Sequence, residues 1–289
     1  MNLTSLPFDI LLEILVYLPF KDLLKMSNTN KFFREFIKNF EWSVVFKVKN
    51  ISRDLIKQIL IKIRVASIYF ENINIDDIVY SLNFIENCKS IAFTNFNPQP
   101  QHLRPLLDIS VFEKLSNIEN IEILGFNINE HGLKLLKKCR KIKFARMDYK
   151  HFTNSLITLD LESIYFTDCS FIYNNEINNF KIPTLKLLSI NYSDGLFQNE
   201  LKNLFQNNPQ LEHIMLNEVI TSPDTFDDLC KLSCLKTLEV SGRGINDHAI
   251  KYINNLKSLK NLYKVVMRNT SIYYTNNIDL DTRYFIHDF

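Results

Sequence analysis

The sequence predicts an α+β repeat protein, with three short helices at its N-terminus followed by an α/β solenoid built on a parallel sheet. Three observations predict this fold class. Apolar residues recur every three or four positions between residues 5 and 46, which is the spacing of amphipathic helices. From residue 65 onward, a pattern apolar-x-x-apolar-x-apolar recurs nine times, at intervals of about 21 to 30 residues. The 289 residues include only five glycines, in agreement with a solenoid that needs few left-handed turns.

The charge balance and the cysteine count exclude several classes of protein. The chain has 34 basic and 32 acidic residues and no polybasic stripe, so nucleic acid is not expected as a partner. We find no signal peptide and no apolar run long enough to cross a bilayer, so we expect no membrane partner and a cytoplasmic and/or nuclear location. Five cysteines, an odd number, favour buried thiols in a reducing compartment over a disulfide framework.

The three N-terminal helices are expected to be short. Ser5 is positioned to cap the first helix, which Pro19 ends. A second helix follows, then a polar turn over residues 27–30, and a third helix that ends near Trp42. Three helices in about 40 residues have more apolar surface than they can cover among themselves. The module is therefore expected to bury a face on a partner, or alternatively on the rest of the chain.

The same segment resembles an F-box. The resemblance rests on Leu6-Pro7-x-Asp9, on Leu18-Pro19-x-x-Asp22-Leu23-Leu24, on Asn30-Lys31-x-Phe33-Arg34 and on Trp42 at the family's distances. It implies binding to a Skp-type adaptor and, through that adaptor, to a cullin ubiquitin ligase. The residues that it assigns to adaptor binding are the apolar ones of the module: Leu6, Pro7, Ile10, Leu11, Ile14, Leu15, Leu18, Pro19, Leu23, Leu24, Phe33 and Trp42.

The repeated pattern has the period of leucine-rich repeats. Each unit supplies one short strand with alternating inward residues and then a helix or turn, and stacked units share one core. Two connections, over residues 128–133 and 245–250, are similar to the strand-to-helix connection of the cysteine-containing repeat type that accompanies many F-boxes. This resemblance implies a right-handed α/β leucine-rich-repeat solenoid with a parallel concave sheet.

Four segments follow from these patterns. We expect an F-box over residues 1–46, a helical linker or solenoid cap over 47–64, about nine repeats over 65–275 and a C-terminal cap or tail over 276–289. The longest interval between repeats contains a proline-rich loop, residues 97–105, which we interpret as an irregular insertion rather than a binding loop. The tail is expected to cover the last repeat, with a docking peptide as the alternative.

Motifs for catalysis are absent from the sequence. It contains no phosphate loop, dinucleotide fingerprint, nucleophile elbow or helical zinc-protease motif. Cys230 and Cys234 have no second pair nearby for zinc, and Cys88, Cys139 and Cys169 fall at inward repeat positions, where cysteine acts as a small apolar residue. The sequence therefore predicts no enzyme, no cofactor and no metal site.

The outward side chains of the repeat strands form three columns across the predicted concave face. These columns are mostly uncharged, with one basic spot and several large apolar or aromatic side chains of the kind that anchor protein interfaces. The candidate target-binding residues are Tyr69, Lys141, Lys143, Tyr165, Leu187, His213, Met215 and Glu239.

Together these patterns favour a non-catalytic substrate receptor of an SCF-type (Skp-cullin-F-box) ubiquitin ligase. The F-box would hold the adaptor, and the repeats would hold a target protein that the sequence does not identify. One alternative is an interaction scaffold or decoy that occupies the adaptor without promoting ubiquitination. Another is a leucine-rich-repeat module that binds partners without any ligase.

Overall fold

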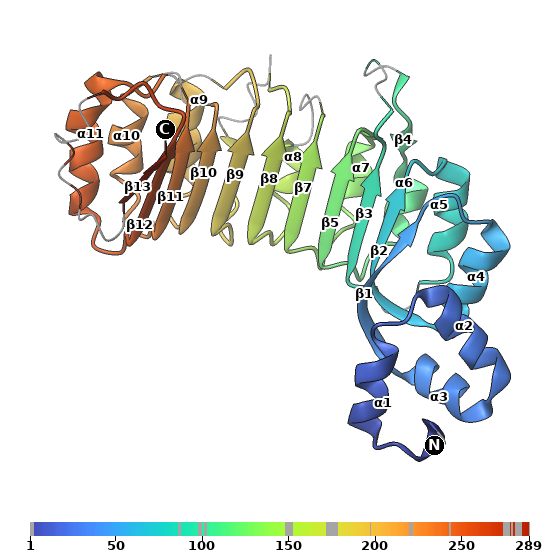
Figure 1. Cartoon of the computed structure of the whole chain (residues 1–289). Coiled ribbons are helices and arrows are strands. Elements are labelled where there is room, and N and C mark those ends of the chain that lie inside the picture. The colour runs from blue at the N-terminus through green and yellow to red at the C-terminus, as the bar shows by residue number, and fades with distance from the viewer. Residues whose placement is uncertain are drawn as a thin grey trace. The chain divides into compact units, whose positions relative to one another are not determined.

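The computed structural model describes residues 3–85, 88–97, 100, 103–147, 153–171, 179–196, 198–219, 222–242, 244–273, 278, 280 and 285–288. The chain divides into two compact units, Met1–Leu136 (unit 1) and Lys137–Phe289 (unit 2), and each is described by itself. The predicted fold class is confirmed, since helices at the N-terminus precede repeated strands that pair in parallel in both units. Figure 1 shows the elements along the chain.

Unit 1 begins with the helical module and continues into the first repeats. Its helices are α1 (Phe8–Leu15), α2 (Phe20–Thr29), α3 (Lys31–Asn39), α4 (Arg53–Lys62), α5 (Ile75–Leu82), α6 (Ile109–Glu113) and α7 (Glu130–Leu133), after a 3-10 turn over Leu3–Ser5. Its strands are β1 (Glu41–Val48), β2 (Arg64–Glu71), β3 (Ser90–Thr94), β4 (Leu106–Leu107), β5 (Asn120–Leu124) and β6 (Asn127–Ile128). The main sheet has the order β1-β2-β3-β5, and β4 pairs with β6 in a separate small sheet.

Strand β1 is the main difference from the sequence prediction. It crosses the expected boundary at residue 46 and pairs in parallel with β2, so the sheet begins before residue 65. Phe46 and Val48 are buried, and the intervening Lys47 is exposed, as expected of a strand with one covered face. A bulge between Trp42 and Val45 shifts the register and interrupts this alternation. The expected linker over 47–64 therefore consists of the end of β1 followed by α4.

Two local expectations within the helical module were wrong. Ser5 does not cap α1, because Pro7 occupies the N-cap position without a side-chain bond. The expected polar turn is mostly helical, since α2 extends to Thr29 and only Asn30 lies between α2 and α3. The hydroxyls of Ser27 and Thr29 donate to carbonyls three residues earlier, which satisfies them inside the helix. Asn30 then caps α3 by accepting a hydrogen bond from the Phe32 amide.

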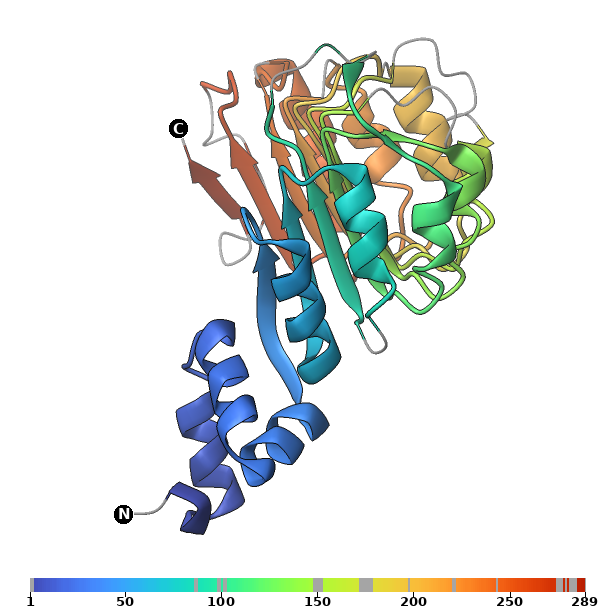
Figure 2. The same ribbon diagram turned by 90° about the vertical axis from the view of Figure 1, so that its right-hand side faces the viewer.

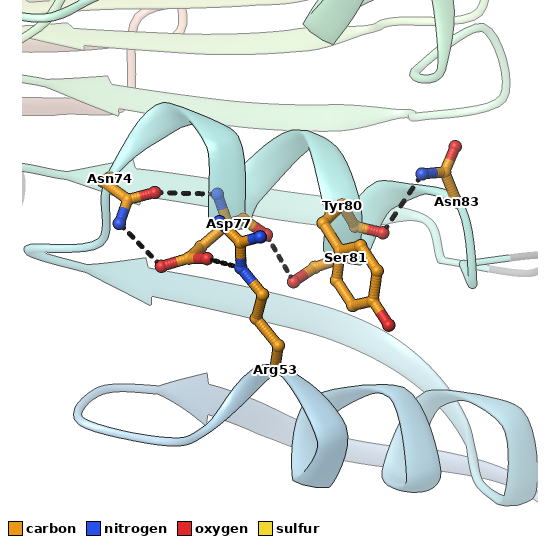
Figure 3. A network of polar contacts seen from close by, with 6 residues as sticks. All are labelled: Arg53, Asn74, Asp77, Tyr80, Ser81 and Asn83. Atoms are coloured by element: carbon orange, nitrogen blue, oxygen red, sulfur yellow. Dashed lines mark hydrogen bonds and ion pairs between the residues drawn. The ribbon is translucent and has the colours of Figure 1, made fainter.

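Helices α4 and α5 are held together by a polar network (Figure 3). Asn74 caps α5 by accepting from the Asp77 amide at 2.8 Å, and its own side-chain amide donates to the Asp77 carboxylate at 2.7 Å. Arg53, the first residue of α4, also pairs with Asp77, and its guanidinium lies 5.7 Å from the centroid of the Tyr80 ring. This network fixes the first repeat helix against the helix that precedes it.

Unit 2 contains the remaining repeats. Its strands are β7 (Lys141–Ala145), β8 (Ser163–Thr167), β9 (Leu187–Asn191), β10 (His213–Asn217), β11 (Thr237–Ser241), β12 (Lys264–Arg268) and β13 (Phe285–Asp288), which pair in this order. Its helices are α8 (Thr153–Leu156), α9 (Gln198–Asn207), α10 (Thr225–Leu229) and α11 (Ile250–Asn255), with 3-10 turns over Asp247–Ala249 and Leu256–Ser258. The helices lie on one side of the sheet (Figures 1 and 2). Strand β13 lies in the expected tail and extends the sheet beyond β12.

The strand register agrees with the predicted alternation of inward and outward residues. Ile142 and Phe144 on β7, for example, are buried toward the helices, and Lys141, Lys143 and Ala145 alternate with them on the other face. We call the other face of the unit 2 sheet the open face. It comprises the three outward positions on each strand from β7 to β12, in register from Lys141-Lys143-Ala145 to Lys264-Val266-Arg268.

Phe96, just after β3, is 47% exposed. Its amide donates to the Asn72 side chain at 2.8 Å, at the point where the chain leaves the repeat path and enters the proline-rich insertion. The insertion returns through β4, whose Leu107 is buried. Residues 98–99 and 101–102 of this loop lie outside the described residues.

A residue in the left-handed backbone conformation, with positive φ, directly follows most of the repeat strands, and we call it the corner residue. Seven described non-glycine residues have positive φ, and six of them directly follow a strand: Asn72, Arg146, Asp168, Tyr192, Glu218 and Asn269. Glycine occupies the corresponding corner after β5 and β11. The amide of most of these corner residues donates to the last carbonyl of the next strand, as from Tyr192 to Asn217 at 2.8 Å. The expectation that few glycines mean few left-handed turns was therefore wrong, because other residues adopt this conformation.

Candidate functional site

The first candidate site is the outward face of helix α1. Leu11 and Leu15 are 0% and 1% exposed and point into the module, whereas Ile10 and Ile14 are 44% and 42% exposed. Residues four apart lie on the same side of a helix, so Ile10 and Ile14 form one apolar stripe. Tyr17, at 86% exposure, lies just beyond the end of α1. This stripe, with the exposed Pro7 at its start, is the α1 face.

The interior of the module explains why the α1 face remains uncovered within it. Half of the twelve residues predicted to bind the adaptor are buried and form the module core instead: Leu11, Leu15, Leu23, Leu24, Phe33 and Trp42. The indole N–H of Trp42 donates to the Ile37 carbonyl at 3.0 Å, and its ring packs edge-on against Phe40. The other half are exposed or half-buried: Leu6, Pro7, Ile10, Ile14, Leu18 and Pro19. The buried six hold the helices of the module together, and the adaptor contact predicted for all twelve stays a prediction.

Two exposed apolar features of the module were not among the predicted residues. Tyr17 follows Ile14 at helical spacing, so the sequence carried a signal for it. Phe32 is 42% exposed and, with Phe36, Phe40 and neighbouring polar residues of α3, lines an open hollow of about 520 Å³. The adjacent Phe33 is buried, and sequence spacing alone does not distinguish these two neighbours.

The second candidate site is the open face of unit 2, which carries seven of the eight predicted target-binding residues. Lys141 and Lys143 on β7 have their ammonium groups 5.0 and 5.6 Å from the centroid of the Tyr165 ring on β8. Leu187 on β9 and Met215 on β10 are half-buried. Glu239 on β11 pairs with an arginine of β12. The seventh of these residues, His213 on β10, has its Nδ1 2.8 Å from the Thr237 hydroxyl.

Two amides line the open face near the carboxyl ends of its strands. Asn217 donates to the Asn191 side-chain oxygen at 2.7 Å, and Asn191 donates to the Ser189 hydroxyl at 2.9 Å. The sequence columns contain these residues, but they do not reveal their pairing. At the far end of the face, the expected outward residue Val266 is 1% exposed, so it is not available to a partner.

The eighth predicted residue, Tyr69, belongs to β2 of unit 1. The ammonium of Lys47 on β1 lies 5.2 Å from its ring centroid, and both Lys47 and Lys49 pair with the Glu71 carboxylate. Glu71 is only 6% exposed. The hydrogen bond from Lys47, and then that from Lys49, lower the pKa of the Glu71 carboxyl below its ordinary value near 4.5. Tyr69 is therefore part of a contact between β1 and β2.

We predict that the Glu71 contact weakens in acid. A carboxyl with a lowered pKa in the folded state contributes stability above its ordinary pKa, and this contribution is lost as the pH falls through the lowered value. The free energy of unfolding of the wild type should therefore decline from pH 5 toward pH 3 more steeply than that of Glu71→Gln. Urea unfolding at several pH values measures the two slopes, and equal slopes would contradict the prediction.

Of the five cysteines, three are buried, Cys230 is half-buried and Cys234 is exposed. Cys88, Cys139 and Cys169 are buried at inward positions, as predicted. Burial, and secondarily the nearby Asp227, raise the pKa of the Cys230 thiol to about 11, which keeps it protonated at neutral pH. Among the described residues, no group of three or more histidine, cysteine or acidic side chains is arranged to hold a metal ion.

The described helices include none with the length and apolar character needed to span a membrane.

Comparisons with known proteins identify a family for the N-terminal module and solved structures with a similar fold. Residues 3–42 match the F-box domain family. No curated protein matches the sequence. Among solved structures, the chain is similar to TLR13 in a TLR13–ssRNA13 complex, with a TM-score of 0.58 and 13% identity over 91% of this chain. It spans only 37% of that TLR13 chain.

Internalin C2 of Listeria monocytogenes is also similar, with a TM-score of 0.44 and 19% identity, over 73% of this chain and 83% of that chain. Residues 3–42 are therefore an F-box domain, and the fold similarity to TLR13 agrees with the leucine-rich-repeat fold that the sequence resemblance implied.

Proposed function

We propose that this chain, in which an F-box domain precedes a leucine-rich-repeat solenoid, is the substrate-recognition subunit of an SCF-type ubiquitin ligase. The α1 face would bind a Skp-type adaptor and, through it, a cullin. The repeats would bind a target protein. We place this activity in the cytoplasm and/or the nucleus.

The observation that carries the proposal is the pairing of the F-box match with an uncovered apolar stripe on its first helix. Residues 3–42 match the family, and Ile10 and Ile14 within them are more than 40% exposed. Exposing large apolar side chains to water is unfavourable. A partner that covers them removes this apolar surface from water and so gains binding free energy. The buried core of the module fixes the position of α1, and Ile10 and Ile14 are not part of that core.

The proposed mechanism is positioning, and it requires no chemistry from this chain. Holding a target beside a ubiquitin-loaded enzyme raises the effective concentration of the reacting groups. An F-box joined to a leucine-rich-repeat fold is typical of non-catalytic adaptor proteins. We therefore propose that the chain is not itself an enzyme.

We predict that Ile10→Ala/Ile14→Ala weakens adaptor binding about 100-fold, or about 2.7 kcal/mol, because two anchors of the interface are removed. The change should leave the fold intact, since both side chains are largely exposed. Calorimetric titration of the full chain with a Skp-type adaptor measures the affinity, and circular dichroism checks the fold. Leu103→Ala, at a position of unit 1 that is 60% exposed and outside the F-box match, is the matched control.

Undiminished affinity of the double variant would overturn the proposed adaptor site. If adaptor binding follows the prediction, a reconstituted ligase assay separates a receptor from a decoy. A receptor promotes ubiquitin transfer to a bound protein, whereas a decoy lowers the activity of other receptors and promotes no transfer.

A further inference from the structure

The charges of the open face differ from those of the chain as a whole. The chain has nearly equal numbers of basic and acidic residues, with a net charge of +2. The open-face positions of β7–β12 hold four cations, Lys141, Lys143, Lys264 and Arg268, and a single carboxylate, Glu239. Arg268 pairs with Glu239. The open face is therefore a basic surface on a nearly neutral protein.

The cations lie on the first and last strands of the face, and the middle is uncharged. The open-face positions of β8, β9 and β10 contain no lysine, arginine, aspartate or glutamate. Tyr165, Ser189 and Met215 are in register across these three strands, and Leu187 lies two residues before Ser189. Ser189 is 0% exposed, so larger side chains cover it. We call Tyr165, Leu187 and Met215 the apolar patch.

Polar side chains around the apolar patch already have partners within unit 2. The Asn217–Asn191–Ser189 chain lies toward one end of the strands, and the His213–Thr237 contact lies on the side of β11. A rim of hydrogen-bonded polar groups around large apolar side chains is the arrangement found at the energetic centre of many protein interfaces. The apolar patch therefore fits a large apolar side chain of a partner.

Lys141 lies next to the apolar patch and places a positive charge at its edge. Its ammonium lies 5.0 Å from the centroid of the Tyr165 ring. Within the residues that the structure describes, Lys141 forms no ion pair, and no acidic residue occupies an open-face position from β7 to β10. A carboxylate from a partner can therefore approach Lys141 without displacing one from this face.

We infer that the open face binds an acidic segment of a target protein, with a large apolar side chain on the apolar patch and a carboxylate at Lys141. This inference rests on the proposed function, in which the repeats bind the target. Neighbouring strands are about 4.8 Å apart, so β7, which carries Lys141, lies about 5 Å from the strand of Tyr165 and about 10 Å from the strand of Leu187. An extended segment rises about 3.3 Å per residue, which places the carboxylate two or three residues from the apolar side chain.

The same geometry disfavours a nucleic acid. Nucleic-acid binding depends on many phosphate contacts along a backbone, and these require a continuous row of cations. On this face the cations of β7 are separated from those of β12 by three uncharged strands, β8–β10, and by β11, whose only charged open-face residue is Glu239. The partner we infer is therefore a protein segment.

A random 12-residue peptide library, selected on the full chain, tests the inference. Enriched peptides should share aspartate or glutamate two or three residues from leucine, methionine or phenylalanine. Enrichment of any other pattern, or of none, would overturn the inference.

The affinity of the best peptide should then depend on the named residues. Lys141→Glu should weaken it at least 10-fold, and Met215→Ala should weaken it by a similar factor. Lys202→Glu on α9 makes the same charge change away from the open face and should alter the affinity less than 2-fold. Equal effects of Lys141→Glu and Lys202→Glu would mean that only the overall charge matters, and the inference would fail.

Two further measurements identify which conclusion fails. Binding of a 12-nucleotide single-stranded RNA that is lost in Lys141→Glu would replace the protein segment by a nucleic acid. Adaptor titration is independent of the open face. Adaptor binding without the peptide pattern overturns this inference alone, whereas the peptide pattern without adaptor binding overturns the proposed ligase function alone.

Discussion

Replacing Trp42 with alanine should lower the free energy of unfolding of unit 1 by about 3–5 kcal/mol, as is usual when a fully buried large aromatic side chain is removed. The ring is 0% exposed and lies at the start of β1. Its N–H donates to the Ile37 carbonyl near the end of α3, so the substitution also leaves a buried acceptor without its donor. Helix α3 and strand β1 should therefore lose their connection together.

Urea unfolding followed by circular dichroism measures this loss, because the variant lacks the only tryptophan of the chain. Trp42→Phe keeps most of the buried volume and should lose much less stability. Tyr17→Ala, at a position that is 86% exposed, should leave stability unchanged. A loss in Trp42→Ala no larger than in Trp42→Phe would show that the module does not depend on this residue.

Gly125→Ala should destabilise unit 1 by about 2–5 kcal/mol, the sum of a left-handed conformation and a steric overlap. Gly125 has φ of 71°, and a Cβ atom there would lie 2.3 Å from the backbone oxygen of Asn95. A backbone oxygen cannot rotate away as a flexible side chain can, so β3 and β5 would have to separate. Thermal or urea unfolding of the full chain measures the effect.

Tyr192→Gly is the matched control for the corner after a strand. Tyr192 has the same left-handed conformation, with φ of 50°, but its side chain is 64% exposed. Glycine relieves the conformational cost there and adds about 0.5–1 kcal/mol of chain entropy, so stability should stay the same or rise by up to about 1 kcal/mol. If Gly125→Ala were as mild as Tyr192→Gly, the overlap with Asn95 would not exist.

The repeats were predictable from the sequence because the repeat strands share the same alternation of buried apolar residues and outward residues. The inward residues of β7–β11 are buried as the alternation indicates, and the outward columns are in register. Strand β1 was not predicted. Phe33, Ile37 and Phe40 continue a helical spacing up to its first residues, and the bulge after Trp42 interrupts the period of two that would have revealed a strand.

The candidate sites were predictable in position but not in detail. Leu11 and Leu15 have the same spacing as Ile10 and Ile14, and only the packing of the folded module decides which pair is buried. Similarly, the sequence placed Lys141 and Tyr165 on one face, but their contact depends on side-chain conformation. A pattern of apolar residues thus identifies a helix or a strand, whereas exposure depends on the neighbours that the fold supplies.

The position of β1 has a consequence for the order in which the protein folds during synthesis. Trp42 and Phe46 belong to a strand whose partner, β2, ends at Glu71. The ring of Phe20 in α2 also packs edge-on against Phe46. The helical module leaves the ribosome before β2, so β1 has no partner strand until the first repeat strand has been made. The strand that continues from the module therefore completes its backbone pairing only after the first repeat has begun to form.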